Sequence, residues 1–171
     1  MKMQLRFPLE DIHDLSARYA YQSSGTVIVT EVVPRARRQR FLSQGDLDIL
    51  CRWKSPRIGR RCLDNPPEFV EAVSAVALST SNERLRVELL VLLRGVGWPM
   101  ASVILHWCHT DPYPILDYRA LWSLGLDALP SYYDFDLWWR YVCACREIAD
   151  QAGVDKRTLD RALWQYSKEN Q

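Results

Sequence analysis

Apolar residues recur along most of the chain at the three- and four-residue spacing of helices that pack one side against a core. Two segments depart from this one-sided pattern. Residues 83–93 and 98–109 are apolar on nearly every face, which predicts helices at the centre of a bundle. A turn containing Gly95 and Gly97 separates them. The pattern therefore predicts a mostly α protein, a compact helical bundle in which a tight glycine turn joins two central helices.

Signals for helix ends divide the rest of the chain into further helices. The run Asn65-Pro66-Pro67-Glu68 predicts a helix start, with Asn65 as the cap, proline in the first turn and Glu68 reaching back. Residues 80–83 repeat this signal. Residues 26–33 are instead rich in β-branched side chains, which favours a short strand or extended arm near the N-terminus. We expect the other helices over residues 8–22, 44–53, 117–125, 134–150 and 155–168.

The chain of 171 residues suits one domain with a substantial core, and it contains no internal repeat, low-complexity tract or separating linker. We therefore expect a single domain over residues 1–171. No apolar run approaches the roughly 18 to 20 residues that a membrane span needs, and the N-terminus lacks the apolar core of a signal peptide. We expect a cytoplasmic protein that contacts no membrane.

The net charge is only +1, but basic residues are concentrated in one region. Residues 34–61 hold nine Lys and Arg against two Asp, whereas the C-terminal third is acidic. This distribution predicts a basic face. The basic run at 35–40 and the segment 53–57, which contains Lys54 and Arg57, are candidates for phosphate contacts. A solvated charged surface is the alternative for both.

The cysteines are odd in number and lack the spacing of a disulfide framework, so we expect reduced, buried thiols. Cys143 and Cys145 lie about 200° apart around a helix and cannot chelate one metal ion. His106 and His109 share a helix face, but no third ligand accompanies them, and we expect packing or capping roles. The five cysteines are Cys51, Cys62, Cys108, Cys143 and Cys145.

The turn Gly95-Val96-Gly97 has the chemistry of a main-chain phosphate clamp. Glycine adopts positive φ and lets a backbone approach closely, while the amides that open the next helix point outward and attract an anion. Twenty positions after Gly97 stands Asp117, in the run Tyr113-Pro114-Ile115-Leu116-Asp117-Tyr118. A helix, a glycine turn, a second helix and then a lone carboxylate suit a protein that holds a DNA phosphate and acts on a nearby sugar.

These residues carry a family resemblance. The Gly-Val-Gly turn, Ala101, Ile104-Leu105 and Pro114-Ile115-Leu116-Asp117 resemble the helix-hairpin-helix GPD superfamily of DNA glycosylases, and most of all its adenine-mismatch branch. The specific likeness covers about residues 85–125. It implies a hairpin and catalytic region at about 83–125, with residues 1–40 and 127–171 completing a second helical lobe. It also implies double-stranded DNA as the partner and a monomeric protein.

In this family, the aspartate matching Asp117 stays ionised beside the deoxyribose of an extruded nucleotide, stabilises the developing positive charge and helps to orient or deprotonate water. Glycosidic cleavage builds positive charge on the sugar, and a fixed carboxylate in a dry site stabilises that charge strongly. The alternative role for Asp117 is to cap the following helix. Trp98 and Tyr118 are the candidates for lining the base pocket, with core packing as their alternative.

The resemblance further implies that Gly95, Val96 and Gly97 contact DNA. Arg94 stands where the family usually has proline, and it adds a charge to the clamp. Pro99 stands where glycosylases that also cleave the backbone have a nucleophilic lysine, which implies a monofunctional enzyme that leaves an abasic site. The chain lacks the four-cysteine loop of an iron–sulfur cluster, so no cofactor is expected, although a monovalent cation at the hairpin is left open.

Three functions follow as hypotheses. The first is a DNA glycosylase of base excision repair that flips out a damaged, modified or mismatched base and hydrolyses its N-glycosidic bond through Asp117. The second is a non-catalytic helix-hairpin-helix DNA-binding protein. The third is a helical scaffold whose glycine turn only packs two core helices. The retained carboxylate favours the first over the second.

Overall fold

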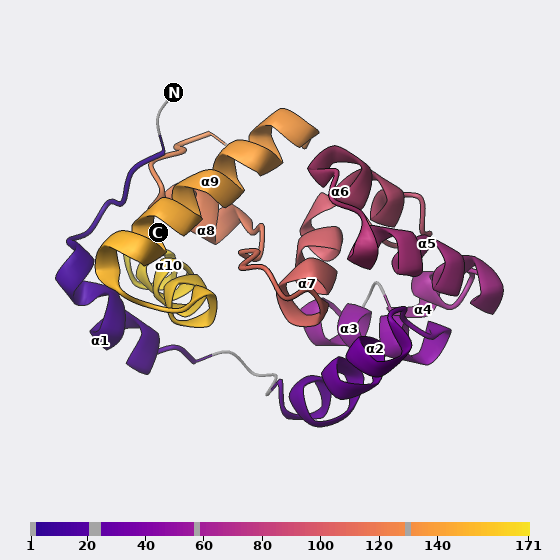
Figure 1. Ribbon diagram of the computed structural model, residues 1–171. Helices are drawn as coiled ribbons and strands as arrows, with labels where there is room; N and C mark the ends of the chain where they lie inside the picture. Colours follow the sequence, from indigo (N-terminus) through magenta and orange to yellow (C-terminus); the bar gives the residue numbers. More distant parts are fainter. Residues whose placement is uncertain (1–2, 21–24, 57–58, 129–130) are drawn as a thin grey trace. The chain divides into compact units, whose positions relative to one another are not determined.

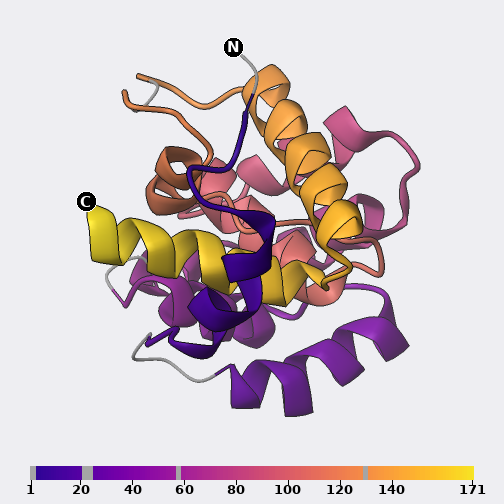
Figure 2. The same ribbon diagram turned by 90° about the vertical axis from the view of Figure 1, so that its left-hand side faces the viewer.

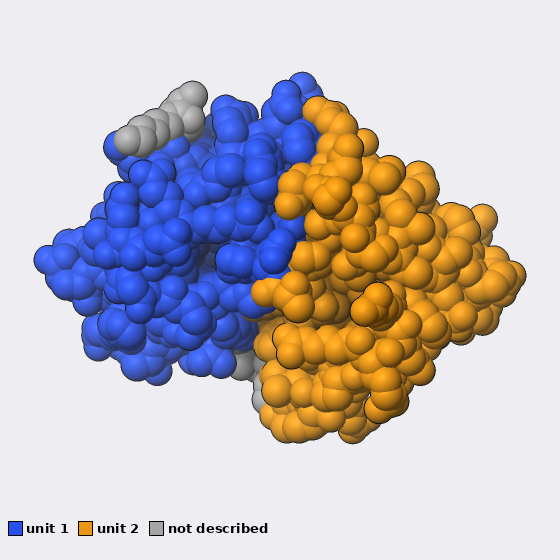
Figure 3. All heavy atoms as spheres, in the orientation of Figure 1, with its two compact units in different colours: residues 1–22, 111–171 blue, residues 23–110 orange. Residues whose placement is uncertain are grey.

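The computed structural model describes residues 3–20, 25–56, 59–128 and 131–171. These residues are mostly helical and include no strand, which confirms the expected mostly α class (Figure 1). The chain divides into two compact units, drawn in two colours in Figure 3. Unit 1 combines Met1–Gln22 with Asp111–Gln171, and unit 2 is Ser23–Thr110. The division falls within the region 83–125, so the hairpin belongs to unit 2 and Asp117 to unit 1.

Unit 2 is built around α7 (Trp98–Cys108). Every side chain of α7 from Met100 to His106 is buried, as expected for a helix that is apolar on all sides. The elements that contact it directly are η2, α2, α3 and α6. The helices of this unit other than α7 are η2 (Ile28–Val32), α2 (Val33–Gln39), α3 (Gln44–Lys54), α4 (Gly59–Cys62), α5 (Pro67–Ser79) and α6 (Glu83–Val91).

The expectation for α6 was wrong in one respect. Only Arg86, Val87 and Leu90 are buried on this helix, whereas Leu85 is 43% exposed and Leu92, just beyond its end, is 60% exposed. The helix therefore packs one side on α5 and α7 and presents the other to solvent. Its apolar composition alone overstated its burial, because exposed single leucines are common on protein surfaces.

The expected extended segment at residues 26–33 was also wrong, because this segment is helical and continues into α2. Ile28, Val32 and Ala36 are buried and recur every fourth position, so helical burial outweighs the strand preference of β-branched side chains. The turn at Ile28–Val32 is a π-helix. Pro34 follows it at the start of α2, and a wider turn relieves the clash of the proline ring with the preceding helical turn.

Of the two helix caps predicted at Asn82 and Asn65, one is present and one is not. The side chain of Asn82 accepts a hydrogen bond from the Leu85 amide and caps α6, as the sequence predicts. Asn65 does not cap α5, because Pro66 occupies the cap position and no side chain bonds to the helix amides there. The Asn65 side chain is instead buried and is used elsewhere in unit 2.

Unit 1 is formed by both ends of the described chain. α1 (Ile12–Ala17) packs against α10 (Lys156–Asn170), as Figure 2 shows, and α10 also contacts α8 (Tyr118–Ser123). The first helix ends well before residue 22. The core includes the fully buried side chains of Tyr113, Trp138 and Tyr141. The remaining helices are η1 (Leu9–Asp11) and α9 (Phe135–Ala152).

Cys51 on α3 and Cys62 on α4 form a disulfide, which corrects the expectation of five reduced thiols. The two residues are 11 positions apart, and their pairing depends on how α3 and α4 pack, which cysteine spacing alone does not show. Cys108, Cys143 and Cys145 are free. Because disulfides are typical of oxidising compartments, the cytoplasmic location stays a prediction. None of the described helices is long and apolar enough to cross a bilayer.

Candidate functional site

The glycine turn joins α6 to α7 through residues 92–97. Gly95 has a φ of +81°, in the left-handed region that favours glycine. Gly97 is extended and occupies the cap position of α7, where its carbonyl accepts a hydrogen bond from the Ala101 amide at 2.8 Å. The sequence prediction of a helix, a glycine turn and a helix is therefore confirmed at this point of the chain.

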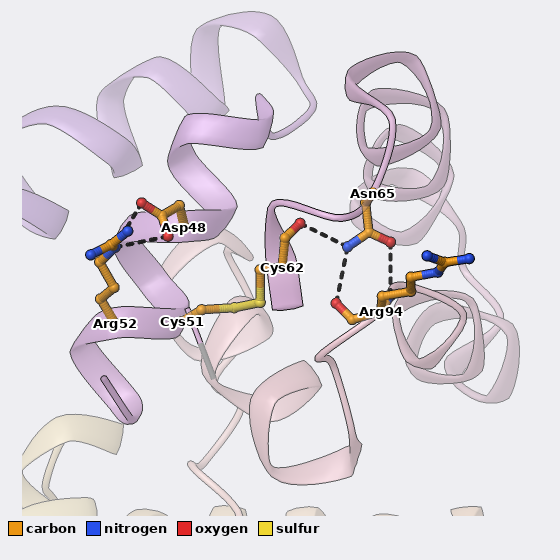
Figure 4. Close-up of a disulfide and its surroundings, with 6 residues drawn as sticks. All are labelled: Asp48, Cys51, Arg52, Cys62, Asn65 and Arg94. Carbon is orange, nitrogen blue, oxygen red and sulfur yellow. Dashed lines mark hydrogen bonds and ion pairs between the residues drawn. A yellow bond between two sulfur atoms is a disulfide. The ribbon is translucent and has the colours of Figure 1, made fainter. Parts of the chain in front are cut away.

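The side chain of Asn65 is hydrogen-bonded to the backbone of the turn (Figure 4). Its Oδ1 accepts a hydrogen bond from the Arg94 amide at 2.7 Å, and its Nδ2 donates to the Arg94 carbonyl at 2.9 Å. The same Nδ2 donates to the carbonyl of Cys62 at 2.8 Å. Because the amide is buried, it holds the turn and the end of α4 in one fixed arrangement.

The turn also lies close against α4 and its disulfide. A Cβ added at Gly95 would stand 3.0 Å from the Cys62 sulfur, 3.2 Å from the Cys62 nitrogen and 3.2 Å from the Arg61 Cβ. Contacts this short are tighter than ordinary packing, so a side chain at Gly95 would fit only if its neighbours shifted by a few tenths of an ångström. The glycine is therefore favoured both by its backbone angle and by its neighbours.

More backbone amides of the turn form hydrogen bonds within the protein than the sequence suggests. Arg94 donates to Asn65, and the Val96 amide donates to the Leu93 carbonyl at 3.0 Å. Within the part of the chain that the structure describes, the amides of Gly95 and Gly97 donate no hydrogen bond. Val96 is only 4% exposed and packs in the core. Any anion held by the turn would therefore meet the two glycine amides rather than all four residues of the expected clamp.

Two arginines accompany the turn. Arg94 and Arg61 are exposed, and neither forms an ion pair with any described residue. Arg61 is the last residue of the basic region 34–61, and its Cβ lies beside Gly95. Lys54 is half-buried in the last turn of α3, where it has a further interaction, and Arg57 lies outside the described residues.

The remaining basic residues of this region differ in whether they form ion pairs. The Arg35 guanidinium binds the buried carboxylate of Asp46 at 2.7 Å, which raises the pKa of Arg35 through the side-chain hydrogen bond. Arg52 binds Asp48 at 2.8 Å. Arg37, Arg38 and Arg40 are exposed and make no ion pair among the described residues. The basic run therefore contains one structural arginine and three that remain available to a ligand.

Asp117 stands at the end of a buried extended segment in unit 1. The residues from Tyr113 to Leu116 are buried, and the Tyr141 hydroxyl of α9 donates to the Ile115 carbonyl at 2.7 Å. Burial raises the pKa of Tyr141, and negative charges including that of Asp117 raise it further. Tyr141 thus fixes the backbone two residues before Asp117. Sequence reasoning assigned no role to Tyr141.

The Asp117 carboxylate caps α8 by accepting a hydrogen bond from the Arg119 amide at 2.9 Å. Its side chain is half-buried, so the carboxylate is neither sealed in the core nor fully solvated. The capping role considered from the sequence is therefore real, and it fixes the carboxylate in place. The neighbouring Tyr118 is 42% exposed, with the Arg119 guanidinium 5.1 Å from its ring centre, while Trp98 in unit 2 is half-buried.

The histidines on α7 have packing partners. His106 is 1% exposed and its ring meets Trp107 edge-on at 5.3 Å. The Nε2 of His109 lies 2.5 Å from the Arg86 guanidinium. Among the described residues, no three His, Cys, Asp or Glu side chains are grouped so that they could hold a metal ion.

Comparison with protein-family models, with curated proteins and with solved structures found no match to this chain.

Proposed function

We propose that this chain is a monofunctional DNA glycosylase with the helix-hairpin-helix GPD fold. The observation that carries the proposal is the geometry of the turn before α7, where Gly95 adopts positive φ against α4 and Gly97 opens the helix. The resemblance of this turn and of Pro114-Ile115-Leu116-Asp117 to the superfamily supports the assignment. Double-stranded DNA is the proposed partner.

In this proposal, the turn holds one backbone phosphate of the DNA. The amides of Gly95 and Gly97 bond to the phosphate oxygens, and the start of α7 favours the negative charge. Pro99 in the first turn of α7 has no amide to contribute to this contact. Arg94 in the turn and Arg61, whose Cβ lies beside Gly95, are both exposed, and in this proposal their guanidinium groups bind the phosphate.

Asp117 acts on the sugar of an extruded nucleotide. When the bond between C1′ and the base nitrogen breaks, positive charge develops on the sugar ring, and a fixed carboxylate stabilises it. Water then adds its hydroxyl to C1′, and its proton leaves with the base. The hydrogen bond from the Arg119 amide holds the carboxylate in one orientation. Tyr118, exposed beside Asp117 in unit 1, is the proposed wall of the base pocket.

Pro99 decides the type of enzyme within this proposal. Proline has no nucleophilic side chain, so no Schiff base with the sugar can form at this position. Water is then the nucleophile, and the product is an intact strand with an abasic site. Such a site breaks on treatment with alkali, which the test below uses.

The test is a panel of labelled duplexes carrying uracil, alkylated, oxidised or mismatched bases. Incubation with the protein and then with alkali is expected to break the strand at one class of lesion, and omission of alkali is expected to leave it intact. Asn caps a helix as well as Asp does, so Asp117→Asn keeps the fold and removes the charge. Binding of every duplex without base release by the wild-type protein would replace this proposal with a non-catalytic DNA-binding protein.

A further inference from the structure

Unit 2 contains a second candidate site, away from the glycine turn in sequence. A cavity of about 430 Å³ opens where α2, α5 and α7 end. Arg37 and Arg40 line it from α2, Ser79 from α5, and His109 and Thr110 from the end of α7. Its volume lies within the range of about 300 to 1,000 Å³ that small-molecule sites occupy.

The lining combines positive charge with an apolar wall. Arg37 and Arg40 form no ion pair among the described residues, and no Asp or Glu lines the cavity. The neighbouring Arg35 differs, because Asp46 neutralises it. Ala36 and Leu78 supply apolar surface beside the arginines. Two available guanidinium groups next to an apolar wall suit an anion attached to an apolar or aromatic body.

Helix ends could oppose an anion here, since the carbonyl end of a helix is negative. At the end of α5, Arg86, which is also paired with Glu83 at 3.3 Å, offsets part of this effect. Arg86 is 4% exposed, and its guanidinium donates to the carbonyls of Ala77, at 3.0 Å, and Thr80, both at the end of α5. The same group contacts the His109 ring at the end of α7. The carbonyls nearest the cavity on α5 are thus already bonded to a buried cation.

Arg40 holds an unusual backbone conformation. It follows α2 with a φ of +64°, and among the described residues it is the one non-glycine residue with positive φ. Glycine is the residue usually found at this position after a helix. An arginine there costs stability, and it places a second guanidinium in the lining of the cavity.

We propose that this cavity binds an organic phosphate. Arg37 and Arg40 hold the phosphate oxygens, and the wall of Ala36 and Leu78 contacts the body to which the phosphate is attached. The phosphate has two sources, a free nucleotide or the 5′-phosphate at the end of a nucleic-acid strand. The proposal does not rest on the glycosylase activity, since its residues lie in α2, α5 and α7 and include neither the glycine turn nor Asp117.

The experiment is calorimetric titration of adenosine 5′-monophosphate into the full chain, with adenosine as the ligand that lacks the phosphate. We expect the nucleotide to bind and adenosine to bind far more weakly. Arg37→Ala and Arg40→Gly each weaken nucleotide binding about tenfold or more, as the loss of a charge-assisted hydrogen bond does. Arg38→Ala is the matched control, because Arg38 is exposed on the same helix but does not line the cavity.

Arg40→Gly separates binding from folding. Glycine relieves the positive φ, so the thermal unfolding midpoint of this variant does not fall below that of the wild type, although its nucleotide binding is weaker. A short single strand with and without a 5′-phosphate distinguishes the two sources. If the phosphorylated strand binds more tightly than the nucleotide and competes with it, the strand end is the ligand; if it does not, the free nucleotide is.

Two results would overturn the proposal. One is that neither the nucleotide nor the phosphorylated strand binds. The other is that Arg37→Ala and Arg40→Gly bind as tightly as the wild type or the Arg38→Ala control. The outcome is distinct from that of the glycosylase test, because Asp117→Asn is expected to leave nucleotide binding unchanged.

Discussion

The Asn65 side chain holds the backbone of Arg94 by two hydrogen bonds, one accepted from its amide at 2.7 Å and one donated to its carbonyl at 2.9 Å. The residues are 29 positions apart, so this contact ties the end of α4 to the glycine turn. It therefore fixes the backbone of the turn at Arg94.

Asn65→Asp tests this contact. The substituted carboxylate still accepts from the Arg94 amide, but it faces the carbonyls of Cys62 and Arg94 without a hydrogen to donate. We expect the free energy of unfolding to fall by about 2 to 3 kcal/mol, measured by urea denaturation, together with weaker DNA binding. In the control Asn82→Asp, the side chain keeps its cap on α6 and stability stays close to the wild type. Equal effects at both positions would contradict the role given to Asn65.

Gly95→Ala tests the fit of the turn against α4. The substitution combines a positive φ with a Cβ within 3.0 Å of the Cys62 sulfur, and we expect a loss of about 2 to 4 kcal/mol. Gly153→Ala is the matched control, because Gly153 has a φ of +65° but nothing within 4 Å of the added Cβ. This control is expected to lose only about 1 kcal/mol. A loss at Gly95 no larger than at Gly153 would show that the neighbours of the turn can move.

The disulfide between Cys51 and Cys62 gives a prediction on thiol content and on stability. Unfolding without reductant and titrating thiols is expected to count the three free cysteines rather than all five. Closing a loop over a separation of 11 residues contributes about 3 kcal/mol in the chain-entropy account. The double variant Cys51→Ala and Cys62→Ala should lose about that much, whereas reductant should not destabilise the double variant further. Five titratable thiols would contradict the pairing.

The contact between α1 and α10 predicts that the stability of the protein depends on pH. Hydrogen bonds from Arg18 and Gln165 lower the pKa of Glu169 to about 2. A lowered pKa means that the carboxylate adds stability above the ordinary glutamate value of about 4.3, and that this contribution is lost as the pH falls toward 2. In Arg18→Gln, nuclear magnetic resonance titration of Glu169 should give a pKa nearer the ordinary value. The same titration in Arg84→Gln, which removes a different exposed ion pair, should still give about 2.

The helices could be predicted where the apolar pattern and the helix-capping residues give clear local signals. The cap at Asn82, the boundaries near Gln44 and Asp155 and the burial of α7 from Met100 to His106 follow from local signals. Residues 26–33 show the limit of such signals. Their β-branched side chains favour strands locally, but the four-residue spacing of the buried positions determines a helix.

The candidate site was predicted only in part. The positive φ of Gly95 and the cap formed by Asp117 follow from residue type and spacing. Three further features depend on contacts between elements distant in sequence, and no local pattern contains them. They are the hydrogen bonds of Asn65 to the turn, the position of Arg61 and the disulfide. The same holds for Tyr141, which fixes the backbone before Asp117 from another helix.

The measurement that tests the central claim most directly is base release under single-turnover conditions, comparing the wild type with Asp117→Asn on the duplex that the panel identifies. Free base is separated by chromatography, and duplex binding is measured in parallel. We predict that the wild type releases the base, and that the variant binds the duplex at least as tightly but releases base slower by about a thousandfold, as expected when a charge that stabilises the transition state is removed. Base release by the variant at the rate of the wild type would contradict the assignment of Asp117 and, with it, the proposed mechanism.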